Sequence, residues 1–381
     1  MKKTDNLYTS LLDKINKEYA SEHQARLKNL LAILCAILVK ETVNLNKLKN
    51  QLGTILGKKD TQADSHYKRL TRFFADGFNQ HRIWKGLLKT VLQLLVKQID
   101  KRGGGKYLLL DATCWQFGKI KIQLLCLSIL YQGVAIPIMW VNLSKKGHSN
   151  FDERKALLQM ASLLHELKGM ILLADREYIG REWFTYLSKA GIDWVIRLPL
   201  GAYKYEISAG KKAYSYLIKK ARKGRMVNQQ LLIEGNNYQF VAFKNLKASD
   251  EKEELVLLLT TLQVNKKRVA AIYSFRWEIE CMFKHLKSNG FHLEDLSMIE
   301  EKKIRLMVTL LIAAYILCVC EGIKKLKQIR SRTSSEGKQT RYESIFRKGY
   351  SSLTNCMQRI ELFVDFLLAV LGKPIRTLKP T

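Results

Sequence analysis

The sequence lacks the cysteine spacing of a metal-binding or disulfide-rich domain. Its seven cysteines are odd in number and scattered, and none forms a C-x2-C pair. Cys318 and Cys320 lie two residues apart in a predicted helix, so their side chains point to different sides. Neither a zinc site nor a disulfide framework is therefore expected, and a reducing cytoplasm fits this pattern.

The sequence also lacks a hydrophobic run that would comfortably span a bilayer. The longest run, 307–320, is shorter than the roughly 20 residues of a transmembrane helix and predicts a buried helix instead. The segment MKKTDNLYTS has no apolar stretch after its lysines, so no signal peptide is expected. We therefore expect a soluble, cytoplasmic protein.

The glycine run 103–105 lacks the lysine and hydroxyl residue of a phosphate-binding loop and predicts a linker.

Acidic residues are scarce relative to basic ones. There are 65 Lys and Arg against 34 Asp and Glu, a net charge of +31, and the excess is spread along the chain. Such a field attracts polyanions, and nucleic acid is the first candidate because each neutralised phosphate releases counterions. A merely basic or ribosome-associated protein would have the same composition.

The first hundred residues predict helices. A strong apolar face runs from Leu30 to Leu38, and Asp64 or Ser65 is the predicted cap of a helix through HYKRLTRFF. Another helix is predicted from Arg82 to Ile99. The basic residues of HYKRLTRFF suit contact with DNA, although a solvated basic face over a core edge explains them nearly as well.

After the glycine run the hydrophobic period changes to that of strands. KYLLLDATCWQF, KIKIQLLCLSILY and GVAIPIMWVNL predict three consecutive strands. FDERKALLQMASLLHELKG predicts a helix capped by Ser149 or Asn150 and ended by Gly169, followed by the strand MILLAD, a helix at 181–189 and the strand DWVIRL. The order β-β-β-α-β-α-β predicts a mixed sheet with a helix on at least one face.

Residues 200–262 interrupt this pattern. KYEI, QQLLIEGNNYQFVAF and ELVLLLTTL predict strands, with the basic stretch KKARKGR at 219–225. We interpret the segment as a β-rich insertion between two parts of the core.

Two acids follow apolar runs, inside or at the end of predicted strands. Asp111 follows YLLL and Asp175 follows MILLA. A charged group there costs free energy unless it is satisfied, and if the two strands are neighbours the carboxylates lie side by side. Like charges that close favour a divalent cation between them, although either acid alone is more often a turn or capping residue.

The segment 273–287, YSFRWEIECMFKHLK, predicts a helix with a polar stripe. Tyr273, Arg276, Glu280 and Lys287 fall on one face at helical spacing, and an apolar face lies opposite. An acid between two cations suits a metal ion beside phosphates, and three carboxylates would suit Mg²⁺ or Mn²⁺. A solvated face with an Arg276–Glu280 pair is the simpler alternative.

The chain resembles the DDE transposases of bacterial insertion sequences. It is most similar to the branch with a Y-x2-R-x3-E-x6-K signature, the insertion-sequence-four family, all four positions of which match without a gap. DATCW resembles the strand of the first acid, and LLADREYIG resembles the motif of the second. The resemblance covers about residues 105–300.

This resemblance implies an α/β fold, with an RNase H-like mixed-sheet core interrupted by a β-rich insertion and flanked by helical N- and C-terminal regions. It implies that Asp111, Asp175 and Glu280 bind two Mg²⁺ or Mn²⁺ ions. Tyr273, Arg276 and Lys287 would then grip the transferred DNA strand. The expected divisions are a helical DNA-binding region (1–102), the first part of the core (103–199), the insertion (200–262), the second part of the core (263–325) and a helical basic region for DNA contact or dimerisation (326–381).

The implied reaction is cut-and-paste transposition of double-stranded DNA. Hydrolysis frees a 3′-hydroxyl at each element end, a hairpin forms and is reopened, and the end joins target DNA. The partners would be terminal inverted repeats and target DNA, and a homodimer is expected because two ends are processed together. A transposase-derived repressor that binds without cutting, and an RNase H-like nuclease that cuts without joining, are the alternatives.

Overall fold

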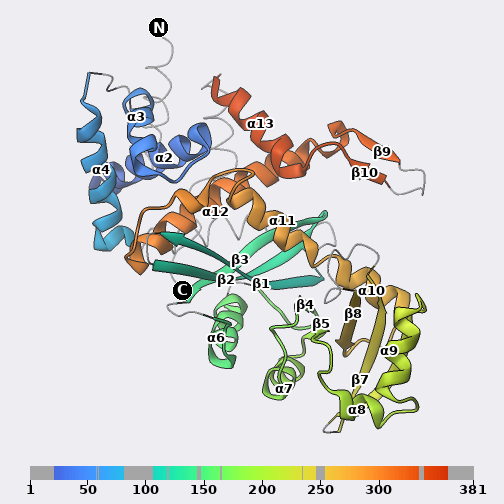
Figure 1. The fold of residues 1–381 in the computed structure, drawn as a ribbon. Coiled ribbons are helices and arrows are strands. Elements are labelled where there is room, and N and C mark those ends of the chain that lie inside the picture. The colour runs from blue at the N-terminus through green and yellow to red at the C-terminus, as the bar shows by residue number, and fades with distance from the viewer. Residues whose placement is uncertain are drawn as a thin grey trace. The chain divides into compact units, whose positions relative to one another are not determined.

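The structure is a computed structural model that describes residues 21–56, 58, 60–80, 106–117, 120–143, 147–163, 165–233, 235–245, 254–333 and 339–358. The described residues belong to two compact units (Figure 1). The sheet unit is drawn from Gly103–Thr113 and Gln123–Cys281. The helical unit is drawn from Met1–Arg102, Cys114–Ile122 and Met282–Thr381. The predicted helix from Arg82 to Ile99 and the predicted glycine linker lie outside the described residues.

An eight-stranded mixed sheet forms the framework of the sheet unit. Its order is β3-β2-β1-β4-β5-β8-β7-β6. The first five strands in that order are β3 (Val134–Leu143), β2 (Ile120–Tyr131), β1 (Tyr107–Phe117), β4 (Ile171–Ala174) and β5 (Asp193–Leu198). β1, β4 and β5 run parallel, whereas β2 and β3 form an antiparallel pair. This mixed α/β sheet confirms the predicted fold class.

The parallel strands are buried, as their unbroken apolar sequences predict. Leu108, Leu109 and Leu110 of β1 and Leu172 and Leu173 of β4 are fully buried. Helix α6 (Phe151–Ser162) packs on β3, and α7 (Arg181–Lys189) packs on β5 (Figure 1). The apolar residues of β1 and β4 therefore supply the core that fixes the ends of these strands.

Helix α6 begins where the sequence predicts and ends earlier. Asn150 caps it through a reciprocal capping box with Glu153. The predicted end at Gly169 is wrong, because the helix stops at Ser162 and Leu163 is 85% exposed. After the helix has ended, the chain buries Leu167.

The insertion continues the same sheet. Its strands β6 (Val227–Ile233), β7 (Asn236–Lys244) and β8 (Leu255–Thr260) are antiparallel, and β8 pairs with β5 of the core. The predicted strand KYEI is wrong, since these residues lie in helix α8 (Lys204–Ser208), and the basic stretch ends helix α9 (Tyr214–Arg222). Helix α9 packs on β6 and β7.

The helical unit is built around α12 (Glu301–Lys324). The helices α2 (Ser21–Lys40), α4 (Ala63–Ala75) and α13 (Ile345–Gln358) pack on α12, and α3 (Leu45–Ile55) joins α2 and α4. The predicted cap at Asp64 or Ser65 is wrong, because α4 begins at Ala63 after Gln62. The remaining elements are η3 (Leu293–Asp295), η4 (Leu326–Gln328) and the hairpin of β9 (Ser331–Thr333) and β10 (Gln339–Arg341).

Helix α12 is long and apolar enough to cross a membrane by length and composition. Its whole apolar window is nevertheless buried inside the fold, as in the core helix of a globular domain. The pair Lys28–Lys40 and Leu45–Ile55 passes the same test only as a broken span bent by 113°. The prediction of a buried helix at 307–320 is confirmed.

Candidate active site

The two predicted aspartates lie on, or directly after, neighbouring parallel strands. The register pairs Leu110 of β1 with Ala174 of β4; Asp111 is the next residue within β1, and Asp175 is the first residue after β4. Adjacent strands lie about 4.8 Å apart, so the two residues are neighbours at the end of β4. Their side chains are 17% and 28% exposed. The condition under which the sequence brings the two acids together, that their strands are neighbours, is met.

The third acid, Glu280, lies in the second of two short helices and not in one continuous helix with Tyr273. Helix α10 (Lys266–Ser274) ends before Phe275, and α11 (Trp277–Leu286) begins after Arg276. The prediction of a continuous helix over 273–287 is therefore wrong. The Arg276 amide bonds to the carbonyl of Tyr273 at 3.0 Å, and the Ile279 amide bonds to the carbonyl of Arg276 at 3.2 Å. These three-residue steps are tighter than the four-residue steps of an α-helix.

Packing of Phe275 accompanies this break. Its ring lies 5.3 Å from the ring of Tyr107 at the start of β1. On the other side of the break, Ile279 is fully buried and Trp277 is 51% exposed. The turn thus directs aromatic and aliphatic groups onto the sheet and leaves the Arg276 side chain, 12% exposed, among the acids.

The guanidinium of Arg276 joins two of the three acids. It lies 3.4 Å from Asp111 Oδ2 and forms a short ion pair with Glu280. Burial alone would lower the pKa of Arg276, but Tyr273, Asp175, Glu280 and Asp111 together hold it above its ordinary value. Arg276 is therefore a permanent cation within the acid cluster.

Asp175 has separate partners. The hydroxyl of Tyr273 donates to its Oδ1 at 3.4 Å, and Arg197 of β5 lies 3.9 Å from the same oxygen. Burial raises the pKa of the Tyr273 hydroxyl, so the group stays protonated and able to donate. Tyr273 and Arg276 thus connect all three predicted acids to one another.

Asp111 has a raised pKa. Burial is the main reason that its pKa lies at about 7; the charge of Arg276 opposes this effect, and the charges of Asp175 and Glu177 add to it. A cation bound beside this desolvated carboxylate would stabilise its charged form.

Lys287 lies in the helical unit with partners of its own. Its ammonium donates to the carbonyl of Cys114 at 2.6 Å and pairs with Glu294 at 3.1 Å. Its side chain is 19% exposed. The residues that the structure brings together in the sheet unit are therefore Asp111, Asp175, Glu280, Tyr273 and Arg276.

The acids fit a hard divalent ion by the type of their donor atoms. All three offer carboxylate oxygens, the ligands that Mg²⁺ and Mn²⁺ prefer, and Asp111 is largely desolvated, so a bound cation would stabilise its charged form. Across the described part of the chain, no three His, Cys, Asp or Glu side chains stand close enough to hold a metal ion as placed. The Arg276 guanidinium, bound to both Asp111 and Glu280, occupies the position between those two acids.

Two site residues were not predicted. Arg197 lies on β5, the strand next to β4, and its only sequence signal is a charge inside the apolar run DWVIRL. Glu177 follows Asp175 by two residues and acts on Asp111 electrostatically. Its signal was its closeness in sequence to the second acid.

The sequence matches a family model described as "Transposase DDE domain" over residues 102–317, more than half of the chain. The chain belongs to this DDE transposase family. It is thus an enzyme that acts on DNA, and enzymes of this family use divalent metal ions.

The transposase was also compared with curated proteins and with solved structures. No curated protein matches its sequence. Among solved structures, the cryo-EM structure of the piggyBac transposase synaptic complex with hairpin DNA is similar at 12% identity, covering 100% of this chain and 85% of that chain with a TM-score of 0.44.

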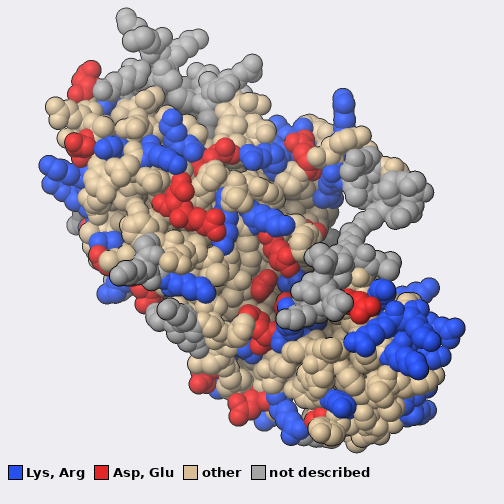
Figure 2. All heavy atoms as spheres, in the orientation of Figure 1, with Lys and Arg blue, Asp and Glu red and all other residues tan. Residues whose placement is uncertain are grey.

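Basic side chains of the transposase gather on the insertion. Figure 2 shows a dense group of Lys and Arg over the position of α9. We define the α9 surface as Lys204, Lys212, Lys219, Lys220, Arg222 and Lys223. Lys204, Lys219, Arg222 and Lys223 line a hollow of about 790 Å³, and Lys212 and Lys220 lie 5.8 and 5.3 Å from the ring of Tyr216. Tyr216 is 44% exposed, so this surface combines positive charge with an accessible aromatic ring.

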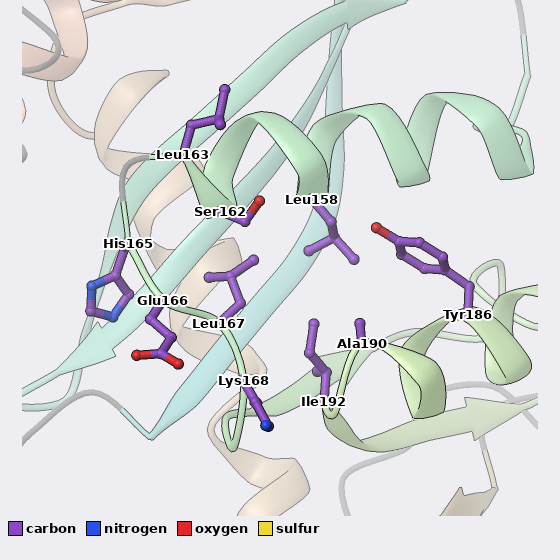
Figure 3. A pocket seen from close by; sticks show the side chains of 10 residues that line it. All are labelled: Leu158, Ser162, Leu163, His165, Glu166, Leu167, Lys168, Tyr186, Ala190 and Ile192. Carbon is purple, nitrogen blue, oxygen red and sulfur yellow. The ribbon is translucent and has the colours of Figure 1, made fainter.

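A second hollow of the transposase, of about 480 Å³, lies away from the acids (Figure 3). It lies between the ends of α6 and α7, with Leu158, Ser162, Tyr186 and Ala190 on its walls. Ile192, just before β5, also lines it, which places it at the opposite end of the parallel strands from Asp175. This hollow is therefore separate from the candidate active site.

Proposed function

We propose that this transposase moves DNA by a cut-and-paste reaction in which Asp111, Asp175 and Glu280 hold two divalent ions, Mg²⁺ or Mn²⁺. The observation that carries the proposal is the meeting of three acids, from segments far apart in the sequence, around Arg276 and Tyr273: Arg276 binds Asp111 and Glu280, and Tyr273 binds Asp175. An ion pair with a purely structural role needs only one acid and one cation. Phosphoryl transfer, in contrast, benefits from a third acid at the same place, because the acids together can hold two metal ions.

Each side chain then has a chemical role. The three acids bind the ions, and ions bound there would activate the attacking hydroxyl and stabilise the leaving oxygen. Arg276 exchanges its acid partners for phosphate oxygens, because a guanidinium binds either group through two parallel hydrogen bonds. Tyr273, protonated at neutral pH, donates its hydroxyl to a further phosphate oxygen.

Lys287 binds the same DNA strand beyond the cleaved bond. Its present partner Glu294 is 52% exposed, so their ion pair is weak and can be exchanged for a phosphate. Hydrolysis, hairpin formation, hairpin opening and strand transfer are all displacements at phosphorus, and one set of acids can serve them all.

DNA would extend beyond the acids onto the α9 surface. Helix α9 buries Tyr214, Leu217, Ile218 and Ala221 against the sheet, so its basic residues face outward. The phosphate backbone fits such a surface by charge. We further propose a homodimer that holds two DNA ends. We also propose that the chain is divided into a DNA-binding region (1–102), the first part of the core (103–199), the insertion (200–262), the second part of the core (263–325) and a basic region for DNA contact or dimerisation (326–381).

The test is an assay with DNA carrying the ends that flank the gene, incubated with Mg²⁺, with Mn²⁺ and with chelator. Metal-dependent nicks at the ends, then hairpins and joined products, are expected. Glu280→Gln should remove cleavage and keep DNA binding, because it removes one metal ligand and little shape. Glu278→Gln, two residues away on α11, is the matched control and should retain cleavage.

Other outcomes separate the alternatives. Cutting without joining would identify a nuclease, and specific binding without cutting would identify a repressor. Full cleavage by Glu280→Gln would remove Glu280 from the active site.

A further inference from the structure

A small cleft in the sheet unit, which we call the arginine cleft, lies where the insertion joins the core. Among the described residues, three arginines and one acid line it: Arg176, Arg197, Arg222 and Glu254. Its apolar wall includes Leu198 of β5 and Leu257 of β8, which are partners in the sheet register. The cleft is therefore rich in positive charge and stands on the strand pair that links the two parts of the sheet.

The arginine cleft adjoins the acids on one side and the α9 surface on the other. Arg197 lies 3.9 Å from Asp175 Oδ1, and Arg176 follows Asp175 directly in the chain. Arg222 belongs to the α9 surface, and both Arg222 and Leu200 also line the hollow of that surface. A DNA strand that runs from the acids to α9 would therefore cross this cleft.

The carboxylate of Glu254 lies between two cations. Its Oε2 is 3.7 Å from Nε of Arg222, and its Oε1 is 3.7 Å from Nζ of Lys244. Both distances exceed the length of a charge-assisted hydrogen bond, which is about 2.7–2.9 Å. The side chains of Glu254 and Arg222 are 35% and 54% exposed, so water screens their attraction. Glu254 is therefore held loosely and can be exchanged for another anion.

The backbone of the β7–β8 hairpin keeps Glu254 in this place. The carbonyl of Glu254 accepts a hydrogen bond from the amide of Asn245 at 2.7 Å, one step beyond the pairing of Lys244 with Leu255. Glu254 and Lys244 thus stand at facing strand ends. A carboxylate and a phosphate present the same kind of oxygen to a guanidinium, so Glu254 has the charge and the acceptor atoms of a phosphate group.

We propose that the arginine cleft binds a phosphate group of the DNA between the acids and α9, and that Glu254 occupies this position in the DNA-free protein. The proposal rests on the proposed function, because it assigns a further contact to the same DNA. The phosphate replaces the Glu254 carboxylate beside Arg222 and Lys244. Glu254 thus competes with DNA and lowers the affinity of the protein for it.

The alternative for Glu254 is a surface ion-pair cluster with Arg222 and Lys244. Pairs this exposed contribute little to stability. The two roles differ in their effect on DNA binding, because only a phosphate site makes Glu254 compete with DNA through Arg222. Removing the acid would otherwise change DNA affinity only through the net charge of the protein.

The test is binding of the full-length protein to a fluorescein-labelled duplex that carries the ends flanking its gene. Fluorescence anisotropy is measured in chelator over a salt series for wild type, Glu254→Gln, Arg222→Gln and the double variant. Glu166→Gln makes the same charge change on the hollow of Figure 3 and is the matched control for net charge. Thermal unfolding checks that each variant is folded.

We expect Glu254→Gln to bind this duplex about fivefold more tightly than wild type, the effect of removing one like charge about 4 Å from a phosphate in water. Its slope of log K against log salt should be steeper by up to about 0.9, because one more counterion is released. Arg222→Gln should bind more weakly than wild type. In the double variant, the gain from Glu254→Gln should disappear, because the phosphate no longer occupies the cleft.

Two results would overturn the arginine cleft as a phosphate site. One is a gain in affinity for Glu254→Gln no larger than that for Glu166→Gln, and the other is an equal gain with and without Arg222. Cleavage of the same duplex by wild type in Mg²⁺ tests the proposed function separately. Cleavage without the gain would overturn the cleft alone, whereas the gain without cleavage would support the cleft as a DNA-binding site and overturn the transposition reaction.

Discussion

Asp111, the first acid of the proposed metal site, is maintained at the expense of stability. Its carboxyl is buried beside Asp175 and Glu177, and its pKa of about 7 lies well above that of an unfolded chain. The folded protein therefore binds a proton that the unfolded chain releases at lower pH. Stability is highest below about pH 4 for this group and falls as pH rises towards 7.

Asp111→Asn should therefore stabilise the metal-free protein while removing its activity. At pH 8 the gain has an upper limit of about 4 kcal/mol from the difference in pKa, reduced by the lost contact with Arg276. Urea unfolding in chelator at pH 8 and pH 5 measures this. The gain should shrink at pH 5, where the wild-type carboxyl is largely protonated. An equal gain at both pH values would contradict the assigned pKa.

At the scale of elements, two glycines determine how α12 and α13 meet. A Cβ at Gly349 would lie 1.7 Å from the carbonyl oxygen of Cys318, and one at Gly322 would lie 1.9 Å from the carbonyl oxygen of Ile345. No side chain fits at such distances, so the two helix backbones approach closely only because both positions are glycine.

Gly349→Ala should destabilise the protein although alanine favours helices. The clash with a backbone carbonyl forces the helices apart, at a cost of about 2 kcal/mol or more. Gly77→Ala is the matched control, because nothing lies within 4 Å of the added Cβ there. It should be neutral or stabilise by up to about 1 kcal/mol. Thermal unfolding of both variants gives the comparison, and equal melting temperatures would refute the close approach.

His285 makes the contact between α11 and α13 sensitive to acid. Its ring stacks on Phe346 with centroids 4.5 Å apart. Burial, and then the charge of Arg347, lower its pKa to about 4. Since the unfolded chain protonates near pH 6.5, stability is full above that value and falls as pH decreases towards 4.

His285→Phe should remove this part of the acid sensitivity. Between pH 7.5 and pH 5 the wild type should lose about 2 kcal/mol more than the variant, from the pKa difference. Urea unfolding of both proteins at the two pH values measures the difference. The variant keeps all other titrating groups, so its own loss of stability between the two pH values is the control for them. The same loss in both proteins would show that His285 does not titrate as described.

At the scale of the whole molecule, the effect of the net charge of +31 on DNA binding depends on where the basic side chains are concentrated. The α9 surface concentrates basic groups on one exposed helix face, and its measurable sign is the salt dependence of DNA binding.

Lys219→Ala with Lys223→Ala should reduce the slope of log K against log salt by about 2, since each phosphate contact contributes about 0.9. Lys168→Ala with Lys189→Ala removes the same charge from exposed positions, Lys168 on the hollow of Figure 3 and Lys189 at the end of α7, and should leave the slope unchanged. Fluorescence anisotropy over a salt series is the measurement. Equal slopes for the two double variants would remove α9 from the DNA-binding surface.

The sequence by itself determined the elements whose signal is local. The strands β1 to β5, the start of α6 and the whole of α7 follow from hydrophobic period and capping residues, and so Asp111 could be placed within a strand and Asp175 at the end of one. The signature Y-x2-R-x3-E-x6-K depended on residue identity and spacing alone, and the family match supports the enzyme class predicted from it.

Only the tertiary structure decided what depends on contacts between distant segments. The stripe at 273–287 looked continuous because its helical period is unbroken, yet packing of Phe275 on Tyr107 accompanies a turn that sends Arg276 to Asp111. The pairing of β8 with β5, and the proximity of Glu177 to Asp111, likewise arise from long-range packing. Periodicity reports the local environment of each residue, whereas the partners of a buried charge are set by the sheet that brings them together.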